Sequence, residues 1–189
     1  MNDVDVALSA VVIYHSVHGH TERLAQAIGE GAAEVEGTTV TVKDVEEASP
    51  EDLLPADVIF WGSPTHFGLL SAAMKQFIDE TISLFRTGSL ADKVGSVFTS
   101  SGAIHGDQEF ALWSLVVPMI QHGMIIVGLE PQDPANNRFG YHFGVGASSL
   151  HHGADERPNQ DELAVARAMG RRATLLAGQL KKGQVADAT

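Results

Sequence analysis

The chain contains 189 residues and has a formal net charge of −12 at pH 7, because 24 Asp and Glu outweigh 12 Lys and Arg. This acidity excludes the basic surface that nucleic-acid binding requires, and the absence of Cys excludes disulfides, thiolate catalysis and Cys-ligated metal centres. The length fits one domain over residues 1–189. No apolar run reaches the ~20 residues of a membrane span, and the opening segment lacks the basic residues of a signal peptide. We therefore expect a cytoplasmic protein with no nucleic-acid or membrane partner.

Short apolar runs predict buried strands at four places in the chain. Each run is rich in Val, Ile or aromatic residues and is bounded by Gly, Ser or Pro, as strands buried on both faces are. A further run, Thr38–Val42, alternates Thr and Val and predicts a half-exposed edge strand. The four buried strands are expected at Ala10–Tyr14, Val58–Trp61, Val94–Phe98 and Met124–Val127.

The segments between the strands have helical periodicity. Four helices are predicted, and the alternation of strands and helices indicates an α/β fold, a doubly wound sandwich of three layers. The first two helices each place five apolar side chains on one face. These faces hold Leu24, Ala27, Ile28, Ala32 and Val35 in the first helix and Met74, Phe77, Ile78, Ile82 and Phe85 in the second. The last two helices are expected at about 108–121 and 161–181.

Two regions depart from this regular pattern. The helix at 108–121 is apolar nearly all round, which indicates either a subunit interface or a helix buried within its own monomer. Residues 128–158 are rich in Gly, Pro, His and Asn without a clear period and predict a loop-rich inserted segment. Flexible tails are expected at 1–7 and 183–189.

Ligands of open parallel sheets bind beyond the carboxyl ends of the strands, so the loops that follow the strands are the candidate sites. The first such loop, residues 15–21, has hydroxyls and a glycine and leads into a helix N-terminus, which is a site for an anion. It contains no Lys or Arg, and neither a P-loop nor a dinucleotide fingerprint is present. A single phosphomonoester held by neutral donors fits this composition. The alternative is structural, with Thr21 as a simple N-cap and Ser16 as a turn residue.

Two further loops have compositions that suit a ligand. Gly62–Gly68 combines a stiff proline, an aromatic side chain and polar groups, which suits a planar heteroaromatic ring with a polar rim. Ser100–Asp107 consists mostly of small residues that could wrap the edge of the same ring with backbone N–H groups.

Three loop sequences carry a family resemblance: Ser16-x-His18-Gly19-His20-Thr21, Ser63-Pro64-Thr65-His66-Phe67-Gly68 and Ser100-Ser101-Gly102. They resemble those of the flavodoxin-like flavoproteins of the WrbA type, which are NAD(P)H:quinone oxidoreductases. The likeness covers about residues 8–180 and includes Gln121–Val127 and Arg157–Leu163. It implies a doubly wound five-stranded parallel sheet of order 2-1-3-4-5 with helices on both faces.

The resemblance also implies an FMN cofactor and its binding residues. The FMN-binding residues would be Ser16, Val17, His18, Gly19, His20 and Thr21; Pro64, Thr65, His66, Phe67 and Gly68; Ser100, Ser101, Gly102, Ala103, Ile104 and His105; and Gln121. His18 and Phe85 would line the substrate pocket. Relatives usually have Tyr, Trp and a flavin-contacting His where this chain has His18, Phe85 and Gln121.

The function implied is transfer of two electrons from NAD(P)H, as co-substrate, to a quinone-like acceptor. FMN would carry the hydride chemistry, so no side chain is assigned as catalytic. Such proteins are homo-oligomers with the flavin at a subunit junction, so a dimer or tetramer is expected. The alternative function is a flavodoxin-type one-electron carrier. Because the chain has nine His, metal binding is a further alternative, but no ligand motif supports it and no metal site is assigned.

Overall fold

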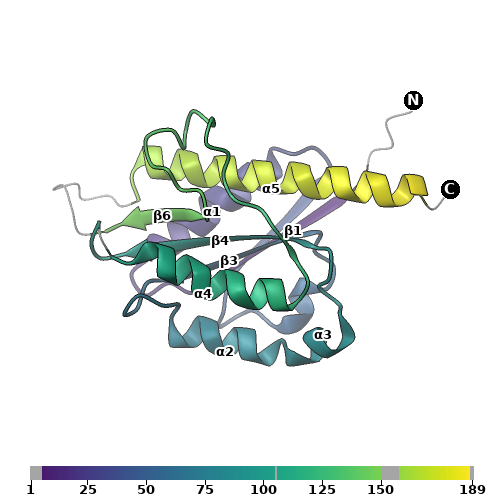
Figure 1. Cartoon of the computed structure of the whole chain (residues 1–189), viewed down its shortest axis with the longest axis horizontal. Coiled ribbons are helices and arrows are strands. Elements are labelled where there is room, and N and C mark those ends of the chain that lie inside the picture. The colour runs from purple at the N-terminus through teal and green to yellow at the C-terminus, as the bar shows by residue number, and fades with distance from the viewer. Residues whose placement is uncertain (1–5, 105, 150–157, 188–189) are drawn as a thin grey trace.

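A computed structural model describes residues 6–104, 106–149 and 158–187. Its described part forms one parallel sheet in the order β2-β1-β3-β4-β5, with β6 also paired to β4 (Figure 1). This arrangement confirms the expected flavodoxin-like order 2-1-3-4-5. The strands are β1 Leu8–Tyr14, β2 Thr38–Asp44, β3 Val58–Pro64, β4 Val94–Ser101, β5 Ile125–Ile126 and β6 Val145–Ser148.

The fifth position of the sheet is shared by two short strands. The expected strand at Met124–Val127 is reduced to Ile125–Ile126, which pairs with the start of β4. The chain then leaves the sheet and returns as β6, which pairs with the end of β4 from Phe98 to Ser101. A side chain at Gly128 would overlap the carbonyl oxygen of His142, so the outgoing and returning segments pass each other closely. The loop-rich segment at 128–158 therefore contains a strand that the sequence did not indicate.

Helices cover both faces of the sheet (Figure 1). Alternate residues of the strands point to opposite faces, and each face packs against its own apolar cluster. Helices α1 His20–Ala33 and α5 Gln160–Asp187 cover one face, and α2 Ala72–Glu80, α3 Ile82–Thr87 and α4 Gln108–Gln121 cover the other. A short 3-10 helix, η1, spans Pro50–Leu53. Among the described residues, no helix combines the length and the apolar character needed to cross a membrane.

Three helices differ from their expected limits. Helix α1 ends at Ala33, so Val35 lies beyond the helix on whose face it was expected. The second predicted helix is broken at Thr81, so that Ile82 and Phe85 lie on a separate helix, α3, and are about half exposed instead of facing the core. Helix α5 continues to Asp187 and includes residues 183–187, which were expected in the tail. Of the tail expected at 1–7, residues 6 and 7 are described, and Ala7 accepts a hydrogen bond from Lys181 of α5. Residues 1–5 and 188–189 lie outside the described part of the chain.

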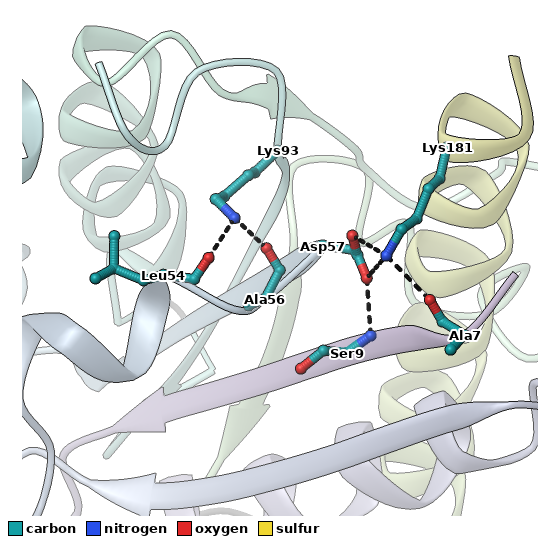
Figure 2. Close-up of polar contacts among 7 residues, drawn as sticks. All are labelled: Ala7, Ser9, Leu54, Ala56, Asp57, Lys93 and Lys181. Atoms are coloured by element: carbon teal, nitrogen blue, oxygen red, sulfur yellow. Dashed lines mark hydrogen bonds and ion pairs between the residues drawn. The ribbon is translucent and has the colours of Figure 1, made fainter. Parts of the chain in front are cut away.

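Polar contacts tie the elements together at the amino ends of the strands (Figure 2). Lys181 of α5 donates to both Asp57 and the carbonyl oxygen of Ala7, and Asp57 also accepts from the backbone N–H of Ser9. Lys93 donates to two backbone carbonyl oxygens just before β3. The contacts of Lys181 fix α5 to the sheet at the end opposite to the loops that were assigned a ligand.

Candidate functional site

A cleft of about 420 Å³ lies at the carboxyl ends of the strands. It brings together residues from all three loops that the sequence singled out, which lie far apart along the chain. We call it the loop cleft. Its lining residues are Ser16, Val17, His18, His20, Thr21, Pro64, Thr65, His66, Ser100, Ser101, Gly102 and Ser149.

The N-terminus of α1 borders the loop cleft without a side-chain cap. Gly19 is the N-cap residue, with φ 81° in the left-handed region, and no side chain of the described residues hydrogen-bonds to the cap. Thr21 lies inside the helix, where its Oγ1 is 2.8 Å from Ser100 Oγ, so the interpretation of Thr21 as a simple N-cap is wrong. An uncapped helix N-terminus with the positive end of its dipole favours an anion.

Ser16 gives a test of whether a phosphate fits this loop. Its Oγ atom is buried and has no hydrogen-bond partner among the described residues. A buried hydroxyl without a partner is destabilising, and a phosphate oxygen would supply that partner. The lining residues include no Lys or Arg. The donors present therefore fit a phosphomonoester bound by hydroxyls and backbone amides.

The second loop forms a tight two-residue turn beside the loop cleft. The backbone N–H of His66 donates to the carbonyl oxygen of Leu69 at 2.9 Å, and the reverse bond is 3.1 Å. Phe67 and Gly68 both have positive φ, 50° and 79°. Phe67 is thus a bulky residue in a left-handed conformation, and its side chain is fully exposed, at 108%. Thr65 and His66 line the loop cleft, whereas Phe67 and Gly68 stand beside it.

The third loop is held in place by hydrogen bonds from its neighbours. Thr65 donates its backbone N–H to the carbonyl oxygen of Ser100 at 2.7 Å, and Gln108 donates to Ser101 Oγ at 2.7 Å. Ser149 extends the pairing of β6, because its N–H donates to the carbonyl oxygen of Ser101 at 2.8 Å. Ser149 was not among the site residues predicted from the sequence. The signal was present, since small and hydroxylated residues follow Val145 as they follow the other strands.

Other residues assigned to the cofactor or to the substrate pocket lie outside the lining of the loop cleft. Ala103 accepts a hydrogen bond from Ser101 Oγ at 2.6 Å, and Ile104 is half exposed. His105 lies outside the described residues. Phe85 and Gln121 line a different cleft, of about 520 Å³, between α2, α3 and the end of α4. We call it the helix cleft. Its lining residues are Ile78, Asp79, Thr81, Ile82, Phe85, Pro118, Gln121 and His122.

The two clefts lie at opposite ends of the sheet. Helix α4 begins at Gln108, just after the carboxyl end of β4, and ends at Gln121. At 1.5 Å per residue its 14 residues span about 20 Å. After α4, the N–H of Ile125 bonds to the carbonyl oxygen of Lys93, which adjoins the amino end of β4. The structure therefore does not bring Gln121 or Phe85 to the loop cleft of their own chain.

Two titratable side chains in these regions have shifted pKa values. Burial raises the pKa of Tyr14, at the end of β1, to about 12, with further contributions from Glu22, Asp44 and Glu47. Burial lowers the pKa of His122. No group of three or more His, Asp or Glu among the described residues could hold a metal ion.

Together, the doubly wound sheet, the uncapped N-terminus of α1 and the small-residue loops at one sheet edge define the flavodoxin-like class of mononucleotide-binding proteins. The chain belongs to the flavodoxin domain family, which matches residues 11–111.

Similar proteins cover nearly the whole chain. A protein of Syntrophus aciditrophicus (strain SB) named NAD(P)H dehydrogenase (quinone) is 36% identical, and the match covers 92% of this chain and 99% of that protein. A protein of the same name from Archaeoglobus fulgidus is 38% identical over 90% of this chain and 97% of its own length. Among solved structures, a WrbA-like flavodoxin from Agrobacterium tumefaciens is 29% identical, with a TM-score of 0.72 over 92% of this chain and 99% of that one.

Proposed function

We propose that this protein is an FMN-dependent oxidoreductase that passes two electrons from NAD(P)H to a quinone. The observation that carries the proposal is the loop cleft, where an uncapped helix N-terminus meets the buried, unpartnered hydroxyl of Ser16. The relatives named NAD(P)H dehydrogenase (quinone) support the choice of donor and acceptor.

Different residues of the loop cleft would bind different parts of FMN. Ser16, Thr21 and the first turn of α1 would hold the phosphate. Thr65 and His66 would border the ring system on one side, and the loop at 100–102 would border its edge. FMN, when bound, supplies the acceptance of hydride from the nicotinamide and its delivery to the quinone. The protein's part is to bind, to orient and to exclude water, which needs no strongly acidic or basic side chain.

An exposed apolar stripe on α4 supports assembly with a second copy. Phe110, Trp113, Val117 and Ile120 are between 44% and 69% exposed, and their spacing places them on one side of the helix. The opposite side of α4, with Leu112 and Leu115 among others, is buried against the sheet. The helix is thus only half covered by its own chain, which favours the subunit-interface interpretation over a helix buried within one monomer.

Assembly would also bring the helix cleft of one chain next to the FMN site of another, as the roles implied for Phe85 and Gln121 require. Phe85 and Gln121 cannot reach the loop cleft of their own chain, so they would serve the flavin of a second copy. We propose a homo-oligomer, a dimer or tetramer, in which the helix cleft of one chain faces the loop cleft of another and forms the pocket for a small quinone-like acceptor. A cytoplasmic location, where NAD(P)H is available, is part of the proposal.

The cofactor assignment is tested by one substitution with a matched control. Gly19→Glu places a side chain on a residue with φ 81° and puts a carboxylate at the phosphate position, so the variant should purify without FMN and without quinone reductase activity. Gly183→Glu adds the same group to α5 at a position with no neighbour within 4 Å and should retain both. Normal FMN content in Gly19→Glu would contradict the proposal.

Anaerobic photoreduction distinguishes this proposal from a one-electron carrier. The enzyme proposed here should be reduced in one spectroscopic step. A carrier would be reduced in two well-separated steps, and that result would favour the alternative while leaving the binding of FMN intact.

A further inference from the structure

We propose that His122 is a positioning residue for the quinone-like acceptor, and that it acts by fixing Phe85 on the wall of the helix cleft. The inference rests on the proposed function, in which the helix cleft contributes to the acceptor site. It concerns a buried histidine that lies outside the FMN-binding loops and to which the family resemblance assigns no role.

The hydrogen bonds of Thr81 determine the tautomer of His122. Thr81 Oγ1 donates its single hydrogen to the carbonyl oxygen of Ile78, at 2.7 Å. His122 Nε2 lies 2.9 Å from the same Oγ1, which can then only accept. The network therefore assigns the hydrogen of His122 to Nε2 and leaves Nδ1 unprotonated. Nδ1 is buried and has no partner among the described residues.

Burial keeps this imidazole neutral and in one orientation. His122 is 7% exposed, and burial lowers its pKa below the usual value. Its backbone N–H donates to the carbonyl oxygen of Pro118 at 3.0 Å, where it caps the end of α4. The ring is thus fixed to α4 through its backbone and to the α2–α3 junction through Thr81.

The same ring supports Phe85 from the protein side. The centroids of the Phe85 and His122 rings are 5.9 Å apart and the ring planes meet at 82°, an edge-to-face contact. The ring of Trp61, fully buried in β3, makes a similar contact with His122 at 6.3 Å and 78°. Phe85 itself is half exposed, so one part of its ring rests on His122 and the rest faces the helix cleft.

The break in the helix makes this support necessary. The helix stops at Thr81 and restarts as α3, so Phe85 lies on a helix of only six residues. A helix this short is not stable by itself and depends on contacts with the rest of the protein. The bond between Thr81 and His122 ties the start of α3 to the end of α4. Loss of that bond should leave Phe85 mobile and weaken the binding of a planar acceptor, while the FMN-binding loops, about 20 Å away, are unaffected.

Acceptor binding is the quantity to measure, with duroquinone as the probe, because its fully substituted ring does not alkylate amines. In calorimetric titrations of the oxidised holoprotein, His122→Phe and Thr81→Val should each raise the Kd for duroquinone several-fold, and the double variant should be no weaker than either single one. His122→Gln, whose amide can place a donor near the position of Nε2, should restore most of the affinity. FMN content should stay unchanged throughout.

The Phe85→Ala variant distinguishes an effect of His122 through Phe85 from a general effect of His122 on the fold. If His122 acts through Phe85, adding His122→Phe to Phe85→Ala should change the Kd no further. Arg86→Gln, an exposed change on the same helix, is the matched control and should bind as the unsubstituted protein does. A His122→Phe variant with unchanged Kd, or one whose effect persists fully in the Phe85→Ala background, would overturn the inference.

Nitrogen-15 NMR of the histidine-labelled protein gives a readout that is independent of turnover. His122 should show a protonated Nε2 and an unprotonated Nδ1, and Thr81→Val should perturb that pattern. The opposite tautomer would overturn the inference. Absence of NADH and NADPH turnover in the unsubstituted holoprotein would instead count against the proposed function, because duroquinone binding and the tautomer are both measured without turnover.

Discussion

Thr21 Oγ1 and Ser100 Oγ lie 2.8 Å apart and are both buried, although 79 positions separate the two residues in the chain. The bond joins the first turn of α1 to the carboxyl end of β4, and thus joins the phosphate end of the proposed site to its ring end. We expect Thr21→Val to destabilise the apoprotein by about 1 kcal/mol, the usual contribution of one such bond. It should also weaken FMN binding, which fluorescence titration of the apoprotein measures. Ser100→Ala should behave alike, and full FMN affinity in both variants would contradict this role.

The backbone of Phe67 stores strain that should be released by substitution. A non-glycine residue at φ 50° costs about 1–2 kcal/mol, and this ring gains nothing from burial in its own chain. Phe67→Asn, which tolerates the left-handed region, should therefore stabilise the apoprotein by about 1 kcal/mol in urea unfolding and weaken FMN binding. Asp92→Asn exchanges two residues that both tolerate the left-handed region, at φ 64° and at the other end of the sheet, and should leave FMN affinity unchanged.

Tyr14 should make the protein sensitive to alkali. Its folded-state pKa is raised to about 12 by burial and nearby carboxylates, whereas the unfolded chain ionises near pH 10. The contribution of the neutral phenol to stability is therefore fully present below pH 10 and is lost as pH rises towards 12, on the order of 1 kcal/mol by pH 11. Urea unfolding at pH 8 to 11 should show this loss, and Tyr14→Phe should reduce it. An equal slope in both proteins would contradict the assignment.

The contact between Asp57 and Lys181 should stabilise the fold more than the exposed pair on α2 does. Asp57 is mostly buried and accepts from both Lys181 and the backbone of Ser9, so Asp57→Asn should cost about 1–2 kcal/mol in urea unfolding. Asp79→Asn breaks the exposed pair with Lys75 and should cost less than about 0.5 kcal/mol. Equal effects of the two changes would contradict the special role of the Asp57 cluster.

The apolar stripe on α4 should control assembly. Val117 is half exposed in one chain, so Val117→Glu should leave the fold intact while placing a charge in the proposed interface. Light scattering after gel filtration should then report monomers, and quinone turnover should fall although FMN remains bound. Glu109→Gln, on the same helix, serves as the control. A Val117→Glu protein that keeps the mass of the unsubstituted oligomer would contradict the assignment of this face.

Much of the fold could be predicted, because most helices and strands form where the local sequence pattern favours them. The helix predicted at about 108–121 is observed at those limits, with a loop of mostly small residues before it and Gly123 after it. Strand β6 could not be found in this way. Its four residues, Val145–Ser148, include Gly and two small residues, and their pairing is set by β4 and by the close passage at Gly128. The break at Thr81 was equally hidden, since the apolar period continues through it while the threonine hydroxyl bonds back to Ile78.

In the site, too, some features could be predicted from the sequence and others could not. Three loops could be assigned to one cleft because the carboxyl ends of parallel strands meet at one edge of a sheet. Phe85, on α3, and Gln121, at the end of α4, were assigned to the site from the resemblance alone, and both lie at the other end of the sheet. Similarity of sequence cannot tell whether a residue serves its own chain or a neighbouring one.

The central claim is that the turn between β1 and α1 binds the phosphate of FMN through hydroxyls and backbone amides. The most direct measurement is the visible spectrum of the purified protein, followed by identification of the ligand released on heating. We predict a yellow protein that releases one FMN per chain and that rebinds FMN after its removal. A protein that remains colourless after incubation with excess FMN would contradict the account.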